Sequence, residues 1–453
     1  MNPQIFREYD IRGIADRDLD GDLVRDLGRA LGTYLRRRES KRIGLGRDTR
    51  LSSGRLRSAL SDGLAETGLD VVDIGVAATP LLYFAVFHLD LDGGVQITGS
   101  HNPPAENGFK LMCGRETLFG ETIQQLREMI EQQDFDLADR GTVEQADLLP
   151  AYIGYLRGNI RLIRTDLRVL VDPGNGCGGP PALQAMRALG LDPEGIFCEM
   201  DGNFPNHHPD PTEPENLTVL IDRVRADGFD VGLAYDGDAD RLGVIDDTGD
   251  IIWGDKLMVL FARQVLQKHP GAAVIGEVKC SQTLYDDIAA HGGRPIIWKT
   301  GHSLIKNKLK AESALLAGEM SGHLFFADKY YGFDDAIYAS LRLLEILAQG
   351  QTSLHELLAD LPQTHVTPEI RVPCDDATKF GVVERVLERF RSIRQVLDVD
   401  GARIIYQDGW GLVRASNTQP VLVLRFEAQS AERLQAIRSE VEAVVEECKK
   451  DNG

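Results

Sequence analysis

Residues 97–104, Ile-Thr-Gly-Ser-His-Asn-Pro-Pro, place a hydroxyl group on a tight turn beside a histidine. The segment follows a short apolar run, and its Asn-Pro-Pro end allows neither a helix nor a strand to continue. Gly99 frees the backbone next to Ser100. Such a turn presents a nucleophile well and packs a core poorly. Taken alone, however, it is more often an ordinary turn serine, so its interpretation depends on the other motifs.

Residues 235–241, Tyr-Asp-Gly-Asp-Ala-Asp-Arg, follow an apolar run at 231–234 and carry three carboxylates at alternate positions. These carboxylates repel one another unless a hard divalent cation binds between them, and ligation by oxygen atoms alone suits Mg²⁺. An EF-hand calcium loop does not fit, because its sixth position would be Arg241 instead of glycine and its twelfth Asp247 instead of glutamate. Arg241 indicates that the partner of the metal is also an anion, such as a phosphate. A solvated acidic turn is the alternative.

Two more polar segments adjoin apolar strands. Residues 318–323, Gly-Glu-Met-Ser-Gly-His, can bind neighbouring sugar hydroxyls, although a helix-capping loop is equally compatible with them. Residues 414–420, Arg-Ala-Ser-Asn-Thr-Gln-Pro, fit a phosphate dianion, or a plain turn between strands. Together the four segments supply a nucleophile, a metal site, a polyol-binding loop and an anion clamp. Four independent coincidences would be needed to explain them all as ordinary loops.

Composition narrows the class of protein. The 453 residues carry a net charge of −20, which argues against a nucleic-acid partner. No apolar run is long enough to cross a membrane, and the first residues show no signal-peptide pattern, so we expect a cytoplasmic protein. The six cysteines are scattered without Cys-x-x-Cys spacing, which indicates reduced core thiols and not a zinc site or a disulfide framework.

A strand–loop–helix–strand pattern occurs three times, and its second strands are expected near 71–74, 195–199 and 295–298. The wide spacing excludes a solenoid and predicts three related α/β domains with mixed, two-sided sheets, followed by a smaller α+β domain. The Gly-rich loop at 174–179 lacks the Gly-Lys-Ser/Thr ending of a P-loop, so it predicts no nucleotide site. The expected domains are 1–148 with the serine loop, 149–252 with the metal loop, 253–364 with the sugar loop and 365–453 with the anion clamp.

In this order, the four motifs resemble those of the α-D-phosphohexomutase superfamily, most closely its bacterial phosphomannomutase/phosphoglucomutase branch. The resemblance covers essentially the whole chain. It implies a heart-shaped protein with four domains around a central cleft, in which the fourth domain moves to close the cleft.

The resemblance also implies roles for the matching residues. Ser100 would be the phosphoserine and, with Asp236, Asp238 and Asp240, would hold one Mg²⁺ per chain. Catalytic roles would fall to Ser100, His101, Lys110, Arg12, Arg241, His302 and His323. Substrate would be bound by Tyr9, Arg12, Lys279, His302, Glu319, Ser321, His323, Arg414, Ser416, Asn417 and Thr418.

The implied reaction interconverts the 1-phosphate and the 6-phosphate of mannose, of glucose or of both, through a hexose 1,6-bisphosphate that turns end for end. Glucose 1,6-bisphosphate or mannose 1,6-bisphosphate would also serve as activator. Lys110, His302 and His323 are candidates for the general base and the general acid, and the sequence does not rank them. We expect a monomer that binds small hexose phosphates and neither nucleic acid nor membranes.

Three alternatives differ in what they require of the motifs. A phosphoglucosamine mutase would differ only in its substrate, and Met320 argues against it, since that branch typically has glutamine there. A Mg²⁺-dependent sugar phosphatase of the haloacid-dehalogenase type would use Asp236 or Asp238 as nucleophile and leave Ser100 idle. A non-catalytic sugar-phosphate binding protein would not need the serine together with the metal site. No residue is an obvious reader of the sugar's second carbon, so the choice between mannose and glucose stays open.

Overall fold

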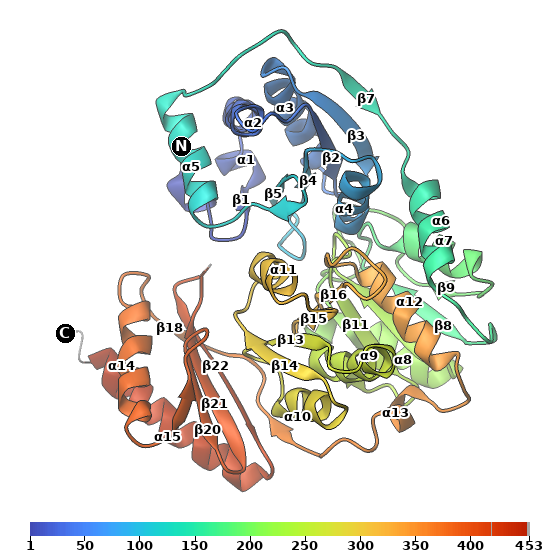
Figure 1. Ribbon diagram of the computed structural model, residues 1–453, viewed down its shortest axis with the longest axis vertical. Helices are drawn as coiled ribbons and strands as arrows, with labels where there is room; N and C mark the ends of the chain where they lie inside the picture. The colour runs from blue at the N-terminus through green and yellow to red at the C-terminus, as the bar shows by residue number, and fades with distance from the viewer. Residues whose placement is uncertain (418, 451–453) are drawn as a thin grey trace.

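The computed structural model describes residues 1–417 and 419–450, which form four sheets. Figure 1 shows the N-terminal domain at the top, the C-terminal domain at the lower left, and the second and third domains packed together at the lower right. Each sheet lies within one of the four predicted domains, and the exact boundaries between the domains stay a prediction. Within the described ranges, no helix combines the length and the apolar character needed to cross a membrane.

The first sheet has the strand order β1-β5-β4-β2-β3-β7, with β6 paired to β5. Its strands are β1 (Ile11–Ile14), β2 (Arg42–Arg47), β3 (Asp70–Val76), β4 (Gly93–Ile97), β5 (Glu106–Cys113), β6 (Glu116–Thr117) and β7 (Val143–Gln145). The helices are η1 (Pro3–Ile5), α1 (Ala15–Asp18), α2 (Gly21–Arg36), α3 (Ser53–Glu66), α4 (Thr79–His88) and α5 (Glu121–Gln132). The inner strands β2, β3 and β4 run parallel, and β5 and β1 close one edge in antiparallel fashion. This order places the predicted serine turn at the carboxyl end of an inner strand, β4.

The second sheet has the order β12-β11-β10-β8-β9. Its elements are α6 (Leu149–Asn159), β8 (Val169–Asp172), α7 (Gly179–Ala188), β9 (Glu194–Gly195), η2 (Pro214–Leu217), α8 (Thr218–Asp227), β10 (Val231–Tyr235), β11 (Leu242–Asp246) and β12 (Ile251–Ile252). Strand β10 is parallel to β8 and antiparallel to β11, so the metal loop is the hairpin that joins β10 to β11. The strand expected at 195–199 is confirmed only at its first residue, because Phe197 takes a φ of 51° and turns the chain away from the sheet.

The third sheet has the order β14-β13-β15-β16. Its elements are α9 (Gly254–Lys268), β13 (Ala273–Glu277), α10 (Gln282–Ala290), β14 (Arg294–Trp298), α11 (His302–Ala311), β15 (Leu316–Gly318), β16 (Leu324–Phe326), α12 (Ala336–Leu347) and α13 (Leu354–Leu357). The predicted sugar loop connects β15 to β16, which pair in antiparallel fashion. The first three sheets therefore share one plan: a parallel centre and an antiparallel edge, as the mixed-sheet prediction required.

The fourth sheet has the order β17-β22-β21-β20-β19, with β18 also paired to β22, and all its pairings are antiparallel. Its elements are β17 (His365–Val366), β18 (Ile370–Pro373), α14 (Lys379–Arg391), β19 (Gln395–Leu397), β20 (Ala402–Tyr406), β21 (Gly409–Ala415), β22 (Val421–Ala428) and α15 (Ala431–Lys450). Both helices pack on one face of the sheet around buried apolar residues such as Val386 and Ile437. This is the smaller α+β domain predicted for residues 365–453, and the anion clamp is its β21–β22 loop.

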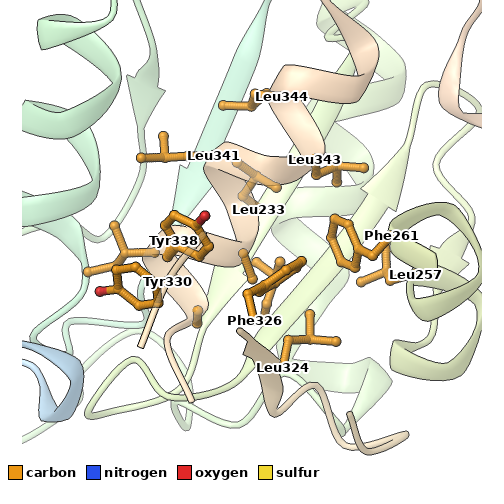
Figure 2. Packing of buried hydrophobic residues seen from close by; sticks show 14 of the residues in the cluster. Leu233, Leu257, Phe261, Leu324, Phe326, Tyr330, Tyr338, Leu341, Leu343 and Leu344 are labelled. Carbon is orange, nitrogen blue, oxygen red and sulfur yellow. The ribbon is translucent and has the colours of Figure 1, made fainter. Parts of the chain in front are cut away.

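One apolar core links the first three domains. It contains side chains from α4 of the first domain, β10 of the second, and α9, β16 and α12 of the third. Figure 2 shows Leu233 of β10 between Phe261 of α9 and Tyr338 and Leu341 of α12, with Phe326 of β16 beneath them. Cys113, Cys177, Cys198, Cys280 and Cys374 are free thiols, as predicted, but of these five Cys177 and Cys280 are buried in the core while Cys113, Cys198 and Cys374 are partly exposed.

Candidate active site

Ser100 sits in a buried turn that the rest of the first domain holds in place. It takes a left-handed φ of 49°, which costs free energy for a residue other than glycine, and only 2% of its surface is exposed. Its N–H donates to Thr98 Oγ1 at 2.8 Å, and its carbonyl oxygen accepts from Arg50 Nη2 at 2.8 Å. Asp48 accepts hydrogen bonds from Thr98 Oγ1 at 2.8 Å and from Arg50 Nε at 3.0 Å. The turn is thus fixed by the loop that follows β2.

The Ser100 hydroxyl points at the metal loop of the second domain. Its Oγ donates to Asp236 Oδ2 at 2.6 Å, and His101 Nδ1 lies 3.1 Å from the same oxygen. A Cβ atom at Gly237 would collide with the Ser100 carbonyl oxygen, so glycine is needed for the two loops to approach this closely. Arg12 also reaches the turn, donating to Asn102 Oδ1 at 3.0 Å. The structure therefore brings together the predicted nucleophile and the predicted metal site.

The three predicted metal ligands are completely buried. Asp236, Asp238 and Asp240 each have 0% exposure, and one carboxylate oxygen from each lies within 4.8 Å of the other two. Lys110 Nζ donates to Asp238 Oδ2 at 2.6 Å and to Asp240 Oδ2. Oδ1 of Asp238 and Oδ1 of Asp240 are buried and have no hydrogen-bond partner among the described residues. Carboxylate oxygens that converge without enough donors fit a hard cation such as Mg²⁺.

Electrostatics support the same interpretation. Burial, and then the neighbouring Asp240 and Asp238 carboxylates, raise the pKa of Asp236 well above its usual value. Burial also acts to raise the pKa of Asp240, but Lys110 and His323 outweigh it and hold that pKa well below its usual range. One carboxyl therefore resists ionisation while its neighbour is ionised, which is the sign of a site that is short of positive charge.

The Gly-rich loop at 174–179 is part of the support for the metal loop. Cys177 N donates to Gly237 O at 3.0 Å, and a Cβ at Gly176 would lie only 2.7 Å from that same oxygen. The glycine content is thus explained by close backbone contact between two loops of the second domain.

The predicted sugar loop packs against the metal loop. Glu319 Oε1 accepts from Gly301 N at 2.7 Å, and Glu319 Oε2 lies 2.7 Å from His323 Nδ1. Ser321 Oγ is 3.2 Å from His323 Nδ1, and Arg241 Nε is 3.4 Å from His323 Nε2. Both oxygens of the Glu319 carboxylate are therefore engaged within the protein, and each keeps a lone pair for a sugar hydroxyl.

His323 and Glu319 form a charged pair. Burial lowers the pKa of His323, but Asp240 and Glu319 outweigh it and raise that pKa to about 9. Burial raises the pKa of Glu319, but the hydrogen bond and the charge of His323 bring it down to about 2. At neutral pH the pair is thus an imidazolium and a carboxylate. His302, by contrast, has a pKa well below its usual value, because it is buried and because Lys306 and Lys110 lie near it.

The predicted anion clamp lies at the start of the β21–β22 loop. Arg414 is 6% exposed, and its Nε donates to Asp400 Oδ2 at 3.0 Å. Ser416 Oγ accepts from Gln419 N at 3.2 Å. Lys279 of the third domain donates to Glu369 Oε1 at 2.6 Å, and its charge is close enough to Arg414 to act on it. Thr418, the remaining predicted member of this clamp, lies outside the described residues.

Three domains meet at Thr300. Its carbonyl oxygen accepts from Tyr9 Oη at 3.1 Å, and its N–H donates to Asp400 Oδ2 at 3.1 Å. Asn417 Nδ2 donates to Tyr9 Oη. Tyr9 is mostly buried here, and burial raises its pKa to about 12. Predicted residues from opposite ends of the chain, Tyr9 and Asn417, are therefore in direct contact.

Comparison with known families identifies the fold of each part of the chain. Four family models match in order: phosphoglucomutase/phosphomannomutase α/β/α domains I, II and III at residues 3–137, 150–249 and 253–365, and the C-terminal domain at 369–444. The chain belongs to the phosphoglucomutase/phosphomannomutase family.

Members of this family from several bacteria are similar over nearly their full length. A phosphomannomutase/phosphoglucomutase of Pseudomonas aeruginosa is 48% identical over 437 residues, which cover 96% of this chain and 94% of the relative. A phosphoglucomutase of Neisseria gonorrhoeae is 44% identical, covering 98% and 96%. The solved structure of a phosphoglucomutase/phosphomannomutase family protein from Burkholderia thailandensis has a TM-score of 0.94 at 42% identity, covering 99% and 98%. The predicted superfamily, the four-domain fold and hexose phosphate mutase activity are confirmed.

Sequence reasoning missed several residues that position this mutase site. Asp48 and Arg50 hold the serine turn, Asp400 holds the clamp arginine, and Glu277 accepts from Met320 N at 3.0 Å at the base of the sugar loop. A signal was available for the first two, since Arg47-Asp48-Thr49-Arg50 is a polar loop directly after a buried strand. For Asp400 and Glu277 no local pattern marks a role, because their partners come from distant segments.

Proposed function

We propose that this chain interconverts the 1-phosphate and the 6-phosphate of mannose, of glucose or of both, through a phosphoserine at Ser100 and a hexose 1,6-bisphosphate. The observation that carries the proposal is the position of Ser100 Oγ, buried and 2.6 Å from a carboxylate of the metal loop. A serine in such a place can carry a phosphoryl group whose charge the site is built to offset. The names of the relatives support both sugars as substrates.

Mg²⁺ is the cofactor that this donor set supports. Asp236, Asp238 and Asp240, with an oxygen of the phosphoryl group on Ser100, would hold one ion per chain. When bound, the ion supplies positive charge that withdraws electrons from the phosphoryl group. Glucose 1,6-bisphosphate or mannose 1,6-bisphosphate would phosphorylate Ser100 and so act as activator. We also propose that the chain works as a monomer.

Cationic side chains surround the proposed transfer. Arg12 reaches the serine turn, Lys110 donates to the metal loop, and Arg241, the last residue of that loop, faces His323. Burial acts to lower the pKa of Arg241, but Asp210 and Asp236 outweigh it and raise that pKa, so its charge is retained. Three fixed charges in a buried site can stabilise the transferring group at little cost in reorganisation.

The other end of the substrate would bind to the third and fourth domains. Arg414, Ser416, Asn417, Thr418 and Lys279 would bind the phosphate that does not react. A clamp that contacts only the phosphate group binds it equally well on the first or the sixth carbon of the sugar. Both orientations of the bisphosphate can therefore be held. Sugar hydroxyls would then face the lone pairs of the Glu319–His323 pair and the hydroxyl of Ser321.

Each transfer also moves protons. The attacking sugar hydroxyl must lose a proton, and Ser100 Oγ must gain one when its bond to phosphorus breaks. In the return transfer the Ser100 hydroxyl loses its proton as it attacks, and His101 Nδ1, 3.1 Å from Ser100 Oγ, is placed to accept it. Burial, together with Arg241 and Arg12, lowers the pKa of His101 well below its usual value, so the neutral ring predominates at neutral pH.

The deciding experiment follows the phosphorus signals of substrates and products. Purified, phosphorylated protein is incubated with Mg²⁺, trace glucose 1,6-bisphosphate and either mannose 1-phosphate or glucose 1-phosphate, and products are identified by phosphorus NMR. Comparable formation of both 6-phosphates is the expected result. A matched Ser100→Ala variant should lose at least about 10⁴-fold in turnover, because the nucleophile is gone.

Other outcomes would select other reactions. Conversion of glucose 1-phosphate alone would narrow the function to a phosphoglucomutase. In a parallel incubation with glucosamine 1-phosphate, conversion of that sugar alone would favour a phosphoglucosamine mutase. Release of inorganic phosphate without isomer formation, by the wild type and Ser100→Ala alike, would contradict the proposal and favour a phosphatase that uses the aspartates.

A further inference from the structure

One carboxylate oxygen of Asp400 accepts hydrogen bonds from two domains at once. Asp400 lies in the turn that joins β19 to β20 in the fourth domain. Its Oδ2 accepts from Arg414 Nε, in the same domain, at 3.0 Å, and from the backbone N–H of Thr300, in the third domain, at 3.1 Å. The carboxylate that holds the clamp arginine is therefore also a contact between the fourth domain and the third.

The backbone of the fourth domain presses Asp400 against Arg414. Gly401 follows Asp400 with a left-handed φ of 84°, and a Cβ atom there would lie 2.4 Å from Val413 O and 2.8 Å from Arg414 Cα. Only glycine can bring the turn this close to β21. The side chains of Asp400 and Arg414 are 16% and 7% exposed, so water competes little for either group. The ion pair is thus part of the fourth domain itself.

Asp400 engages only one of the three nitrogen atoms of the Arg414 guanidinium group. The other two, Nη1 and Nη2, make no hydrogen bond with any described residue. Burial acts to lower the pKa of Arg414, but the charges of Asp400, Tyr9 and Glu277 outweigh it and raise that pKa, so the group stays charged. Two parallel N–H groups of a charged guanidinium suit two oxygens of a phosphate. A carboxylate that takes Nε alone leaves this edge for the phosphate.

Thr300 is held on all sides. Its N–H donates to Asp400, its carbonyl oxygen accepts from Tyr9 Oη of the first domain at 3.1 Å, and its Oγ1 donates to Glu277 Oε2 at the end of β13. All three polar groups of this residue are therefore engaged, and the direction of its N–H is fixed by the first and third domains. Asp400 meets this N–H only when the fourth domain is docked.

We propose that Asp400 is a positioning residue that orients the clamp arginine and ties this orientation to docking of the fourth domain. The inference rests on the proposed function, in which Arg414 binds the phosphate that does not react. With both donors on Oδ2, the carboxylate cannot turn. Without Thr300, it rotates and pairs with Nη1 or Nη2 instead. Because the phosphate-binding edge is then available only in the docked arrangement, phosphate binding and docking favour one another.

Charge and position predict opposite results for Asp400→Asn. A carboxylate repels a phosphate dianion, so an effect of charge alone would lower KM when the carboxylate is removed. An amide binds a guanidinium more weakly, and its NH₂ end offers only donors, so a loss of positioning raises KM. We expect KM for glucose 1-phosphate to rise about tenfold in Asp400→Asn, with kcat changed less than about threefold.

Asp398 provides the matched control, because it lies in the same β19–β20 turn, is 57% exposed and pairs with Arg391 of α14. Asp398→Asn should leave kcat and KM at their wild-type values. In an Arg414→Ala background, Asp400→Asn should raise KM less than about twofold further, because Asp400 acts through that arginine. A KM for Asp400→Asn at or below the wild-type value would overturn the inference, as would an undiminished further loss in the Arg414→Ala background.

Hydrogen exchange of the Thr300 amide gives a readout that needs no turnover. The probe is inorganic phosphate, and exchange is followed by NMR with the Thr300 signal assigned. Phosphate should slow exchange of this amide in the wild type and have little effect on it in Asp400→Asn or Arg414→Ala. Equal slowing in the wild type and Asp400→Asn, or none in the wild type, would overturn the inference. A wild type that binds phosphate in this way but fails to isomerise hexose phosphates would instead overturn the proposed function.

Discussion

Where the first three domains meet, apolar side chains from α4, α7, β10, α9 and α12 form one continuous core. The fourth domain meets the third in another way. Its apolar contact there is a small cluster of Val278, Trp410 and Leu412. Around it, Arg403 donates to Val278 O at 2.6 Å, and Ser281 Oγ donates to Glu427 Oε1 at 3.0 Å. We call these two regions the shared core and the domain IV interface.

The domain IV interface is also incompletely paired. Buried atoms of Arg425, Glu427 and Trp410 have no hydrogen-bond partner among the described residues. Unpaired polar atoms make an interface less costly to open to water, whereas opening the shared core would expose large apolar side chains. The difference indicates that the Ser100 turn and the metal loop are fixed to one another, and we expect the fourth domain, which carries the predicted anion clamp, to be the part that moves. This is the arrangement that a bisphosphate needs in order to turn around.

The largest expected effect breaks the metal loop on the fixed side. Asp238→Asn should lower Mg²⁺-dependent turnover by about 10²–10³-fold and raise the Mg²⁺ concentration needed for half-activation, because it removes charge from a fully buried site. A Mg²⁺ titration of the mutase rate measures both. Asp250→Asn is the matched control, since Asp250 is exposed and belongs to a second group of possible metal ligands with Asp246 and His355. Identical Mg²⁺ curves for Asp238→Asn and the wild type would refute the metal assignment.

Next in size is a direct comparison of the two cores. Leu233 on β10 and Leu424 on β22 are both 0% exposed, the first in the shared core and the second in the core of the fourth domain. Each change to alanine should lower the free energy of unfolding by about 2–5 kcal/mol. Hydrogen exchange should show Leu233→Ala loosening the first three sheets together and Leu424→Ala loosening only the fourth. If either variant loosened all four sheets equally, the two regions would not be independent.

On the movable side, Arg414→Ala should weaken the clamp. Loss of charge-assisted hydrogen bonds to a phosphate should cost about 2–3 kcal/mol, which is a decrease of about 30–150-fold in kcat/KM, mostly through KM. Steady-state kinetics with glucose 1-phosphate measures this. Arg389→Ala provides the control, because Arg389 is an exposed arginine on α14 of the same domain. A KM that stays at the wild-type value would place the phosphate clamp elsewhere.

The smallest effect concerns the ion pair between Glu369 and Lys279, which ties the domain IV segment to the third domain at 2.6 Å. The Lys279 charge lowers the pKa of Glu369 to about 2. The ion pair therefore stabilises docking of the fourth domain on the third at any pH above the usual pKa of a glutamate, and this stabilisation is lost as the pH falls toward 2. Glu369→Gln should weaken docking by about 1 kcal/mol. Small-angle scattering should show a larger radius of gyration for the variant at pH 7, with less change than the wild type between pH 5 and 3. If the variant and the wild type had the same radius of gyration at pH 7, and changed equally between pH 5 and pH 3, the ion pair would not be what holds the domain.

The sequence by itself determined the four motifs, their order and the elements beside them. The apolar spacing placed the strands expected near 71–74 and 295–298 within β3 and β14, because the spacing of each element reflects its own burial. Glycine and proline determined the serine turn in the same local way. The failed prediction at 195–199 depended on Phe197, whose left-handed backbone no local pattern announces.

Only the tertiary structure decided which side chains meet. Ser100 contacts Asp236, 136 positions away in the chain, and Tyr9 contacts Asn417, 408 positions away. Within the third domain, His302 at the start of α11 faces Asp334 in the segment between β16 and α12. The physical reason is that such contacts depend on the order of strands in each sheet and on how the sheets pack, which short segments do not encode. Motifs can therefore name the chemistry, while the orientation of each acid, base and cation is set by the fold that surrounds it.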